Sequence, residues 1–220
     1  MTMGNYTLKD NLFVRPTPAG AFYAVSGPKQ EPSRRMLFHL LRDDVTPAMN
    51  LVNLQHWFGI QDEEEVLELL HRVQELGWIS GEETPVTGPE GSIEEVLVRV
   101  LPDLADEGKV LLADSQGFYL SSHGYPHEAA EELSALSADL GSLYERHEGL
   151  LKNNLGQTLQ SWGLMDAAGN SSLGFWPLFF GQQRFVLALN GRPRFNQPAF
   201  RDMVWALARR YVSEEMFKEQ

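Results

Sequence analysis

Cysteine is absent from this chain of 220 residues. Its absence excludes disulfides, thiol nucleophiles, iron–sulfur ligation and thiolate zinc sites. The sequence also lacks any run of about 18 to 20 consecutive apolar residues, which is the length needed to cross a bilayer. The first ten residues contain neither a basic stretch nor an apolar leader stretch. We therefore expect a cytoplasmic protein that does not insert into a membrane.

Basic residues are scarce, because 18 Lys and Arg stand against 30 Asp and Glu, for a formal net charge of −12. This charge repels phosphate backbones and anionic lipid surfaces unless a basic patch is locally segregated. The densest basic positions, such as Arg34 with Arg35 and Arg209 with Arg210, are too small for a nucleic-acid stripe. The sequence therefore predicts no nucleic-acid partner.

Recognisable catalytic motifs are missing as well. The chain has no Gly-rich phosphate loop and no Gly-x-Ser-x-Gly turn. His123 and His127 are four residues apart, but Gly124 and Pro126 interrupt any helical geometry that would aim both rings at one ion. We interpret both as surface histidines. The expectation is a non-enzymatic protein with no catalytic residue, no metal site and no bound cofactor.

Apolar residues are plentiful, at 43% of the chain, and the length suits two domains of ordinary size. In the first half, Pro-Thr-Pro-Ala-Gly predicts a turn inside a hairpin over residues 12–26. Apolar periodicity predicts helices over 31–42, 46–59 and 62–77, and the second is expected to begin at the cap Thr46. An extended piece follows from Trp78, so the order favours a winged-helix-like module over residues 1–84.

A stretch rich in Gly, Pro, Thr and Glu follows, and we place a linker at 85–91. Residues 92–220 then alternate between helical and extended patterns. The expected elements are a helix from Ser92, strands at 109–114 and 118–122, a long helix over 126–153, three further strands, and a closing helix at 198–211. This order, αββαβββα, predicts a second domain of the α+β class.

Over residues 92–212 the element order resembles the roadblock or dynein-light-chain family. The residues that carry the resemblance are the hairpin Leu111–Phe118, the opening of the long helix at Glu131–Leu140, and the strand Phe185–Leu189. The resemblance implies an α+β domain with a five-stranded antiparallel sheet that acts as a platform. Domains of this family pair through the edge strand that follows the long helix. The paired helices bind small Ras-like GTPases or serve as scaffolds.

Carried over to this chain, the resemblance makes Thr158–Met165 the edge strand. The implied dimer interface consists of Leu159, Trp162 and Leu164 on that strand and Leu136, Leu140 and Leu143 on the long helix. The partner is a second copy of the chain or a sister roadblock protein, with a small GTPase as a further partner. Trp176 and Phe179 are candidates for partner binding, because aromatic residues dominate interface energetics.

A second reading of the same elements is a ligand sensor coupled to a winged-helix transcriptional output. In that reading, His123, Tyr125 and Trp162 line a GAF-like or profilin-like pocket under the long helix. A shared pocket at these three residues favours the sensor. A sheet closed by its helices favours the interaction platform.

Overall fold

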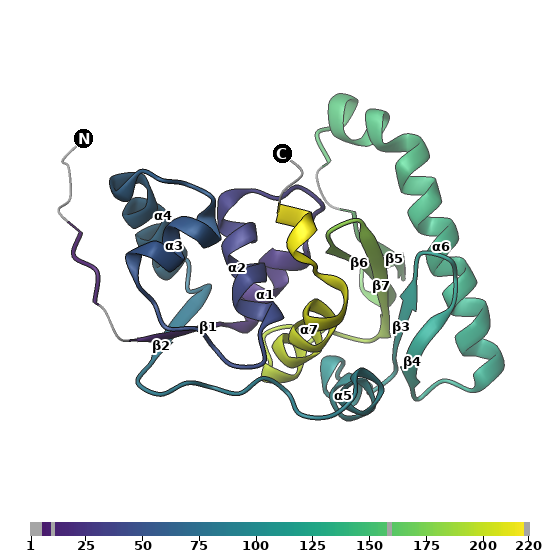
Figure 1. Cartoon of the computed structure of the whole chain (residues 1–220). Helices are drawn as coiled ribbons and strands as arrows, with labels where there is room; N and C mark the ends of the chain where they lie inside the picture. Colours follow the sequence, from purple (N-terminus) through teal and green to yellow (C-terminus); the bar gives the residue numbers. More distant parts are fainter. Residues whose placement is uncertain (1–5, 10–11, 158–159, 218–220) are drawn as a thin grey trace.

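The computed structural model describes residues 6–9, 12–157 and 160–217 (Figure 1). The helices and strands are, in chain order, β1 (Phe13–Pro16), α1 (Pro18–Val25), α2 (Pro32–Arg42), α3 (Leu51–Phe58), α4 (Glu63–Glu75), β2 (Ile79–Glu82), α5 (Ile93–Val100), η1 (Leu101–Leu104), β3 (Val110–Asp114), β4 (Tyr119–His123), α6 (His127–Gly149), η2 (Leu150–Asn154), β5 (Trp162–Met165), β6 (Ser171–Phe180), β7 (Gln183–Asn190), α7 (Pro198–Tyr211) and η3 (Glu214–Phe217). Among them, no helix has both the length and the apolar character required to cross a membrane.

The N-terminal part contains four helices and a two-stranded antiparallel sheet of β1 and β2. The hairpin expected over residues 12–26 is wrong, because the chain turns into helix α1 directly after β1. The Thr17 side chain accepts a hydrogen bond from the amide of Gly20 at 3.1 Å, and Pro18 takes the first helical position. A Cβ at Gly20 would overlap the carbonyl oxygen of Trp78, so glycine permits this close approach of helix and strand.

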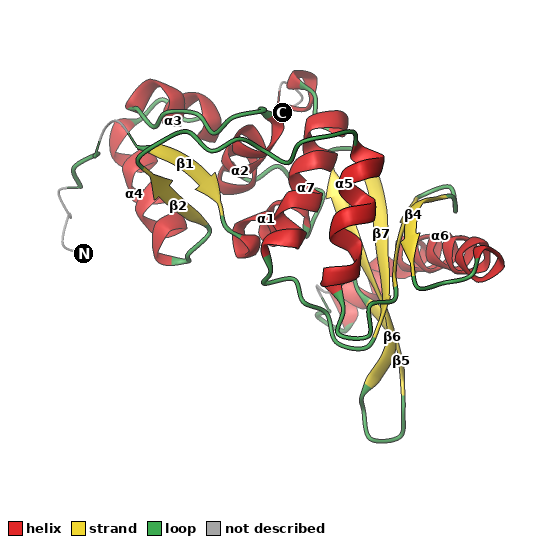
Figure 2. Ribbon diagram, turned by 90° about the horizontal axis from the view of Figure 1, so that it is seen from below, coloured by secondary structure: helices red, strands yellow, loops and turns green. Residues whose placement is uncertain are grey.

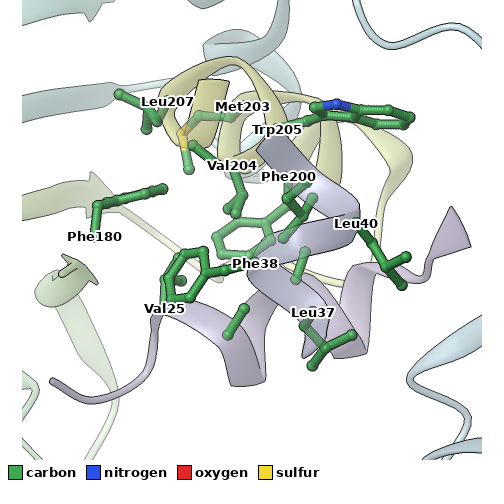
Figure 3. Packing of buried hydrophobic residues seen from close by; sticks show 14 of the residues in the cluster. Val25, Leu37, Phe38, Leu40, Phe180, Phe200, Met203, Val204, Trp205 and Leu207 are labelled. Atoms are coloured by element: carbon green, nitrogen blue, oxygen red, sulfur yellow. The ribbon is translucent and has the colours of Figure 1, made fainter. Parts of the chain in front are cut away.

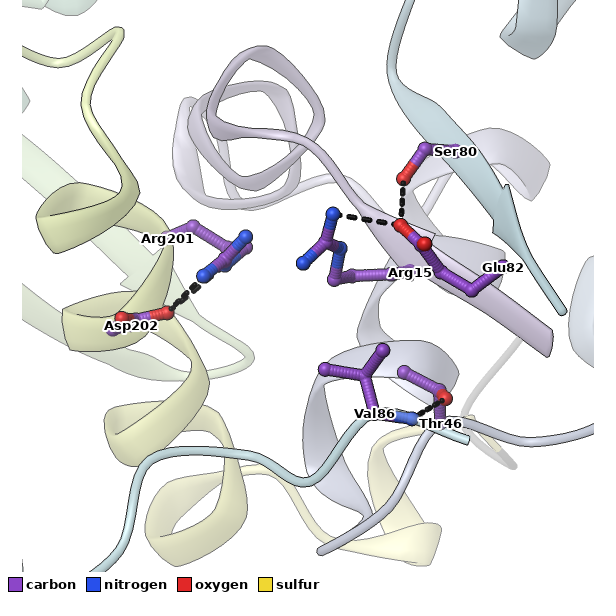
Figure 4. Close-up of polar contacts among 7 residues, drawn as sticks. All are labelled: Arg15, Thr46, Ser80, Glu82, Val86, Arg201 and Asp202. Carbon is purple, nitrogen blue, oxygen red and sulfur yellow. Dashed lines mark hydrogen bonds and ion pairs between the residues drawn. The ribbon is translucent and has the colours of Figure 1, made fainter. Parts of the chain in front are cut away.

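Helix α3 begins later than the sequence predicts. Its cap is Asn50, whose side chain accepts from the amide of Asn53 at 2.8 Å. The expected cap, Thr46, instead accepts from the amide of Val86 at 2.8 Å and so holds the segment after β2 (Figure 4). The assignment of this part as a winged helix stays a prediction.

The second half contains the predicted five-stranded antiparallel sheet, and its strands lie in the order β4-β3-β7-β6-β5. Helices α5 and α7 lie on one face of this sheet and α6 lies on the other (Figures 1 and 2). Helix α5 begins with a capping box: the Ser92 hydroxyl accepts from the amide of Glu95, and the Glu95 carboxylate accepts from the amide of Ser92. The element order αββαβββα is therefore confirmed.

Helix α7 lies at the centre of the molecule, between the N-terminal helices and the sheet (Figure 1). One buried apolar cluster runs from α1 and α2 across α7 to the sheet, and Figure 3 shows Phe38, Phe200 and Phe180 within it. The indole nitrogen of Trp205 donates to the carbonyl of Asp43 at 2.8 Å. Because the two halves share this cluster, we expect each to depend on the other for stability, and the linker at 85–91 stays a prediction.

Candidate interaction surface

Helix α6 lies on the sheet through a stripe of small residues. Ala130, Ser134, Ser137 and Gly141 are spaced four, three and four residues apart, which places them on one side of the helix. The first three are buried, and a Cβ at Gly141 would overlap the guanidinium of Arg184 on β7. Small side chains bring the helix axis close to the strands, so the leucines of α6 lie to the side of the contact.

These leucines lie on a flank of α6 beside the small stripe. At 100° per residue, Leu140, Leu136 and Leu143 lie about 80° to 140° around the helix from the small stripe. Leu136 is 40% exposed, and the other two are half-buried. Leu140 and Trp162 line the same small cavity, so Leu140 is directed toward β5, whereas Leu136 and Leu143 lie outside the lining of this cavity.

Strand β5 is an edge strand, because it pairs with β6 alone. Trp162 lies opposite Phe175, and Leu164 lies opposite Leu173. Leu164 is 58% exposed, and Figure 2 shows the β5–β6 hairpin projecting beyond the rest of the sheet. The strand is shorter than the predicted Thr158–Met165, and Leu159 lies outside the described residues. The other edge of β5 bonds to no strand within the described ranges.

We call Leu136, Leu140, Leu143, Trp162 and Leu164 the α6–β5 surface. The structure places Leu140 and Trp162 in the lining of one cavity, and Leu164 lies on the same edge strand as Trp162, whereas Leu136 and Leu143 belong to this surface as a prediction. Apolar side chains that remain accessible next to an unpaired strand edge are typical of a surface that pairs with another chain.

A cavity of about 20 Å³ lies beneath this surface, between α6 and the β5–β6 hairpin. Three polar atoms of its lining residues are buried and have no hydrogen-bond partner in the described part of the chain: Tyr144 Oη, Trp162 Nε1 and Arg184 Nε. Each such atom costs about 1–3 kcal/mol when it is left unpaired. The space has room for about one water molecule, which could bond to these atoms.

Trp176 and Phe179 do not belong to one surface. Trp176 points to the α7 face of the sheet, where it packs edge-on against Phe195 with ring centroids 5.3 Å apart. Phe179 points to the opposite face and borders a cavity of about 250 Å³ together with Glu145. Their positions on β6 differ by three, and alternate residues of a strand face opposite sides. The two residues therefore stay separate predictions for partner binding, on opposite faces of the sheet.

The three residues of the sensor hypothesis are also separated. His123 ends β4 and Trp162 begins β5, and these strands form opposite edges of the sheet. Four strand spacings of about 4.8 Å place the two edges roughly 19 Å apart. The Tyr125 hydroxyl donates to Asn190, and burial raises the pKa of Tyr125 to about 12. The geometry therefore does not form a pocket from these three side chains.

Sequence reasoning missed the contacts that hold α6 in place. Arg184 on β7 pairs with Glu145 on α6, although the two are 39 residues apart. Gly141 leaves the space that the guanidinium occupies. The periodic small residues of α6 were the available signal, since their spacing marks the side of the helix that approaches another element.

No protein-family model and no curated protein matches the sequence. Among solved structures, the chain is similar to a roadblock/LC7 domain from Streptomyces avermitilis, with 13% identity and a TM-score of 0.34. That match covers 54% of this chain and 92% of the other. It is also similar to MglB of Myxococcus xanthus, with 16% identity and a TM-score of 0.35, over 58% of this chain and 96% of the other.

Proposed function

We propose that the chain is a non-enzymatic regulatory or scaffold protein that forms a homodimer through the α6–β5 surface. The observation that carries the proposal is the unpaired edge of β5, on which Trp162 shares a cavity with Leu140 of α6 and Leu164 is exposed. An unpaired strand edge offers backbone donors and acceptors to another strand, and neighbouring apolar side chains add buried area to the contact.

A second copy of the chain is the occupant that the edge strand fits. Two copies of β5 can pair in antiparallel fashion about a two-fold axis, which makes the interface isologous and closes the assembly at two chains. Trp162 then lies near the axis with Leu164 on the same strand. The flanks of the two α6 helices face each other across the same axis and cover Leu136 and Leu143.

A small Ras-like GTPase is the further partner that we propose, and its support is the resemblance of the sequence to roadblock domains. The paired α6 helices would present a surface formed by both copies. A sister roadblock protein in place of the second copy would use the same edge strand. In that case the purified chain is a monomer and gains mass when the sister protein is added.

Light-scattering mass measured across a concentration series tests the homodimer. The expected mass is about twice the 24.8 kDa of one chain. Leu164→Lys places a charge at the edge of β5, and Leu136→Lys places one on the α6 flank. Each is expected to weaken the dimer at least about tenfold, since either buries an unpaired charge in the contact.

Val52→Lys is the matched control, because Val52 is 73% exposed on α3, far from the sheet. This variant is expected to dimerise like the unmodified chain. A mass of one chain at every concentration would contradict the homodimer. Unchanged dimerisation of both the Leu164→Lys and Leu136→Lys variants would contradict the surface.

A further inference from the structure

Three side chains with metal-binding atoms meet far from the α6–β5 surface. His39 lies on α2, His56 lies in the last turn of α3, and Glu214 begins η3. One ligand atom from each lies within 4.8 Å of the other two. The three positions come from segments that are distant in the sequence, so the fold itself assembles the cluster.

His39 is the buried member of the cluster and is 4% exposed. Its ring stacks on Phe217 with centroids 4.0 Å apart, and it lies 4.8 Å from the ring of His56. The Nε2 atom of His39 is buried and has no hydrogen-bond partner within the described ranges. Buried polar atoms in native proteins are nearly always bonded, so an unpaired imidazole nitrogen beside two further ligands points to a missing bound species.

We propose that His39, His56 and Glu214 bind a divalent transition-metal ion of the zinc class. Two imidazoles and one carboxylate form a donor set that zinc accepts, with bonds of about 2.0–2.2 Å. Tetrahedral geometry at that bond length separates the ligand atoms by about 3.4 Å. In the structure the ligand atoms lie within 4.8 Å of one another, so some of them must move closer to reach this separation. His56 and Glu214 are exposed side chains that can rotate to do so, while stacking holds His39 in place.

The surrounding charges set the affinity of this site. Arg42 Nη1 lies 2.5 Å from a carboxylate oxygen of Glu214, so an incoming ion must compete with Arg42 for that ligand. Arg42 also lies 3.7 Å from Asp43, which can retain it. The guanidinium of Arg35 stacks 5.5 Å from the Phe217 ring and adds a second positive charge nearby. Both arginines oppose a cation, so removal of Arg42 is expected to tighten binding.

Metal binding would join the C-terminal segment to the N-terminal helices. Glu214 belongs to η3, which follows α7, whereas the two histidines belong to α2 and α3. A cavity of about 370 Å³ has Tyr211, Ser213 and Met216 from this same segment in its wall, opposite Lys29. An ion bound by Glu214 would hold this segment of the cavity wall in place. The site is independent of the dimer contact, so either proposal can fail alone.

Calorimetric titration of the full chain with zinc chloride, after treatment with a chelator, tests the proposal. We expect saturation at about one ion per chain. His56→Gln and Glu214→Gln each remove one ligand at an exposed position, where the fold is preserved, and are expected to weaken binding at least about tenfold. Arg42→Met is expected to strengthen it, because Glu214 is then released from its ion pair. Cobalt(II) should give the visible absorption bands of a four-coordinate site.

His71→Gln is the matched control, since His71 is an exposed histidine on α4 that pairs with Glu75 at 3.4 Å. Its affinity for zinc should equal that of the unmodified chain. The proposal is overturned if zinc binding does not saturate, or if the His56→Gln and Glu214→Gln variants bind as tightly as the unmodified chain. A loss confined to the His71→Gln variant would overturn it equally.

Discussion

The two faces of the five-stranded sheet are covered in different ways. On the face toward α5 and α7, Leu112, Leu178 and Leu187 are completely buried in the cluster that continues to the N-terminal helices (Figure 3). On the other face, α6 contacts β3, β4 and β7, whereas Trp162 is half-buried and Leu164 is exposed. The first face is closed by its helices, whereas the second leaves apolar side chains accessible at its β5 edge. The same residue type should therefore have different roles on the two faces.

Replacing one leucine from each face gives the largest contrast. Leu178→Ala removes a fully buried side chain and is expected to lower the free energy of unfolding by about 2–5 kcal/mol, through lost burial and the cavity that remains. Leu164→Ala should change it by less than about 0.5 kcal/mol in the monomer, since that side chain is mostly in water. Urea unfolding at low protein concentration measures both, and equal losses would contradict the contrast.

The buried His39 should make the stability of the folded chain sensitive to acid. Burial, together with the nearby charges of His56, Arg42 and Arg35, lowers the pKa of His39 to about 3. A lowered pKa favours the neutral ring in the folded state, so this stability is present above pH 6.5 and is lost as the pH falls toward 3. Between pH 7 and pH 4 the expected loss is about 3 kcal/mol from this group.

The effect is isolated by comparing the unmodified chain with His39→Phe in the presence of a chelator. The phenyl ring can keep the stacking on Phe217 and has no proton to gain, so the loss of stability between pH 7 and pH 4 should be smaller in this variant. His127→Gln, on exposed α6, is the control and should behave like the unmodified chain. An equal loss of stability between pH 7 and pH 4 in the unmodified chain and in the His39→Phe variant would contradict this role of His39.

Two glycines of α6 sharpen the comparison within one helix. Gly141→Ala places a methyl group where the Arg184 guanidinium lies, so the guanidinium must shift, and we expect a weakened ion pair with Glu145 and no gain in stability. Gly149 has no atom within 4 Å of an added Cβ, so Gly149→Ala should raise stability by up to about 1 kcal/mol through helix propensity. Thermal unfolding measures both, and an equal gain in the two variants would show that α6 does not lie as closely on the sheet as described.

The long amphipathic elements were predictable from the sequence, because their periodicity reflects the face that they bury. Helix α7 occupies Pro198–Tyr211 as predicted, and α4 begins after its cap Asp62. Helix α1 was missed because Pro18–Val25 is apolar almost throughout, and its buried side consists mostly of small residues while Phe22 is exposed, so no apolar period marks the buried side. The cap at Thr46 was misassigned because its side chain bonds to Val86, a contact that local pattern does not encode.

The candidate site was predictable only in part, because local sequence pattern does not encode contacts between distant segments. The resemblance to roadblock domains implied an edge strand after the long helix, and the structure places Leu140 of α6 and Trp162 of β5 at one cavity, while the role of Leu136 and Leu164 in an interface stays a prediction. Alternation on β6 could have separated Trp176 from Phe179, because an odd difference in position places them on opposite faces. The cluster of His39, His56 and Glu214 has no sequence signature, since packing of distant segments brings it together.

The central claim is that the β5 edge of the sheet is covered by a second copy, and amide hydrogen exchange tests it most directly. The two edge strands supply their own comparison: Trp162–Met165 of β5 and Tyr119–His123 of β4. When the protein concentration is raised through the dimerisation range, exchange in β5 should slow while exchange in β4 stays constant. Exchange in β5 that does not depend on concentration while the mass doubles would show that the chains associate elsewhere, and would contradict the account.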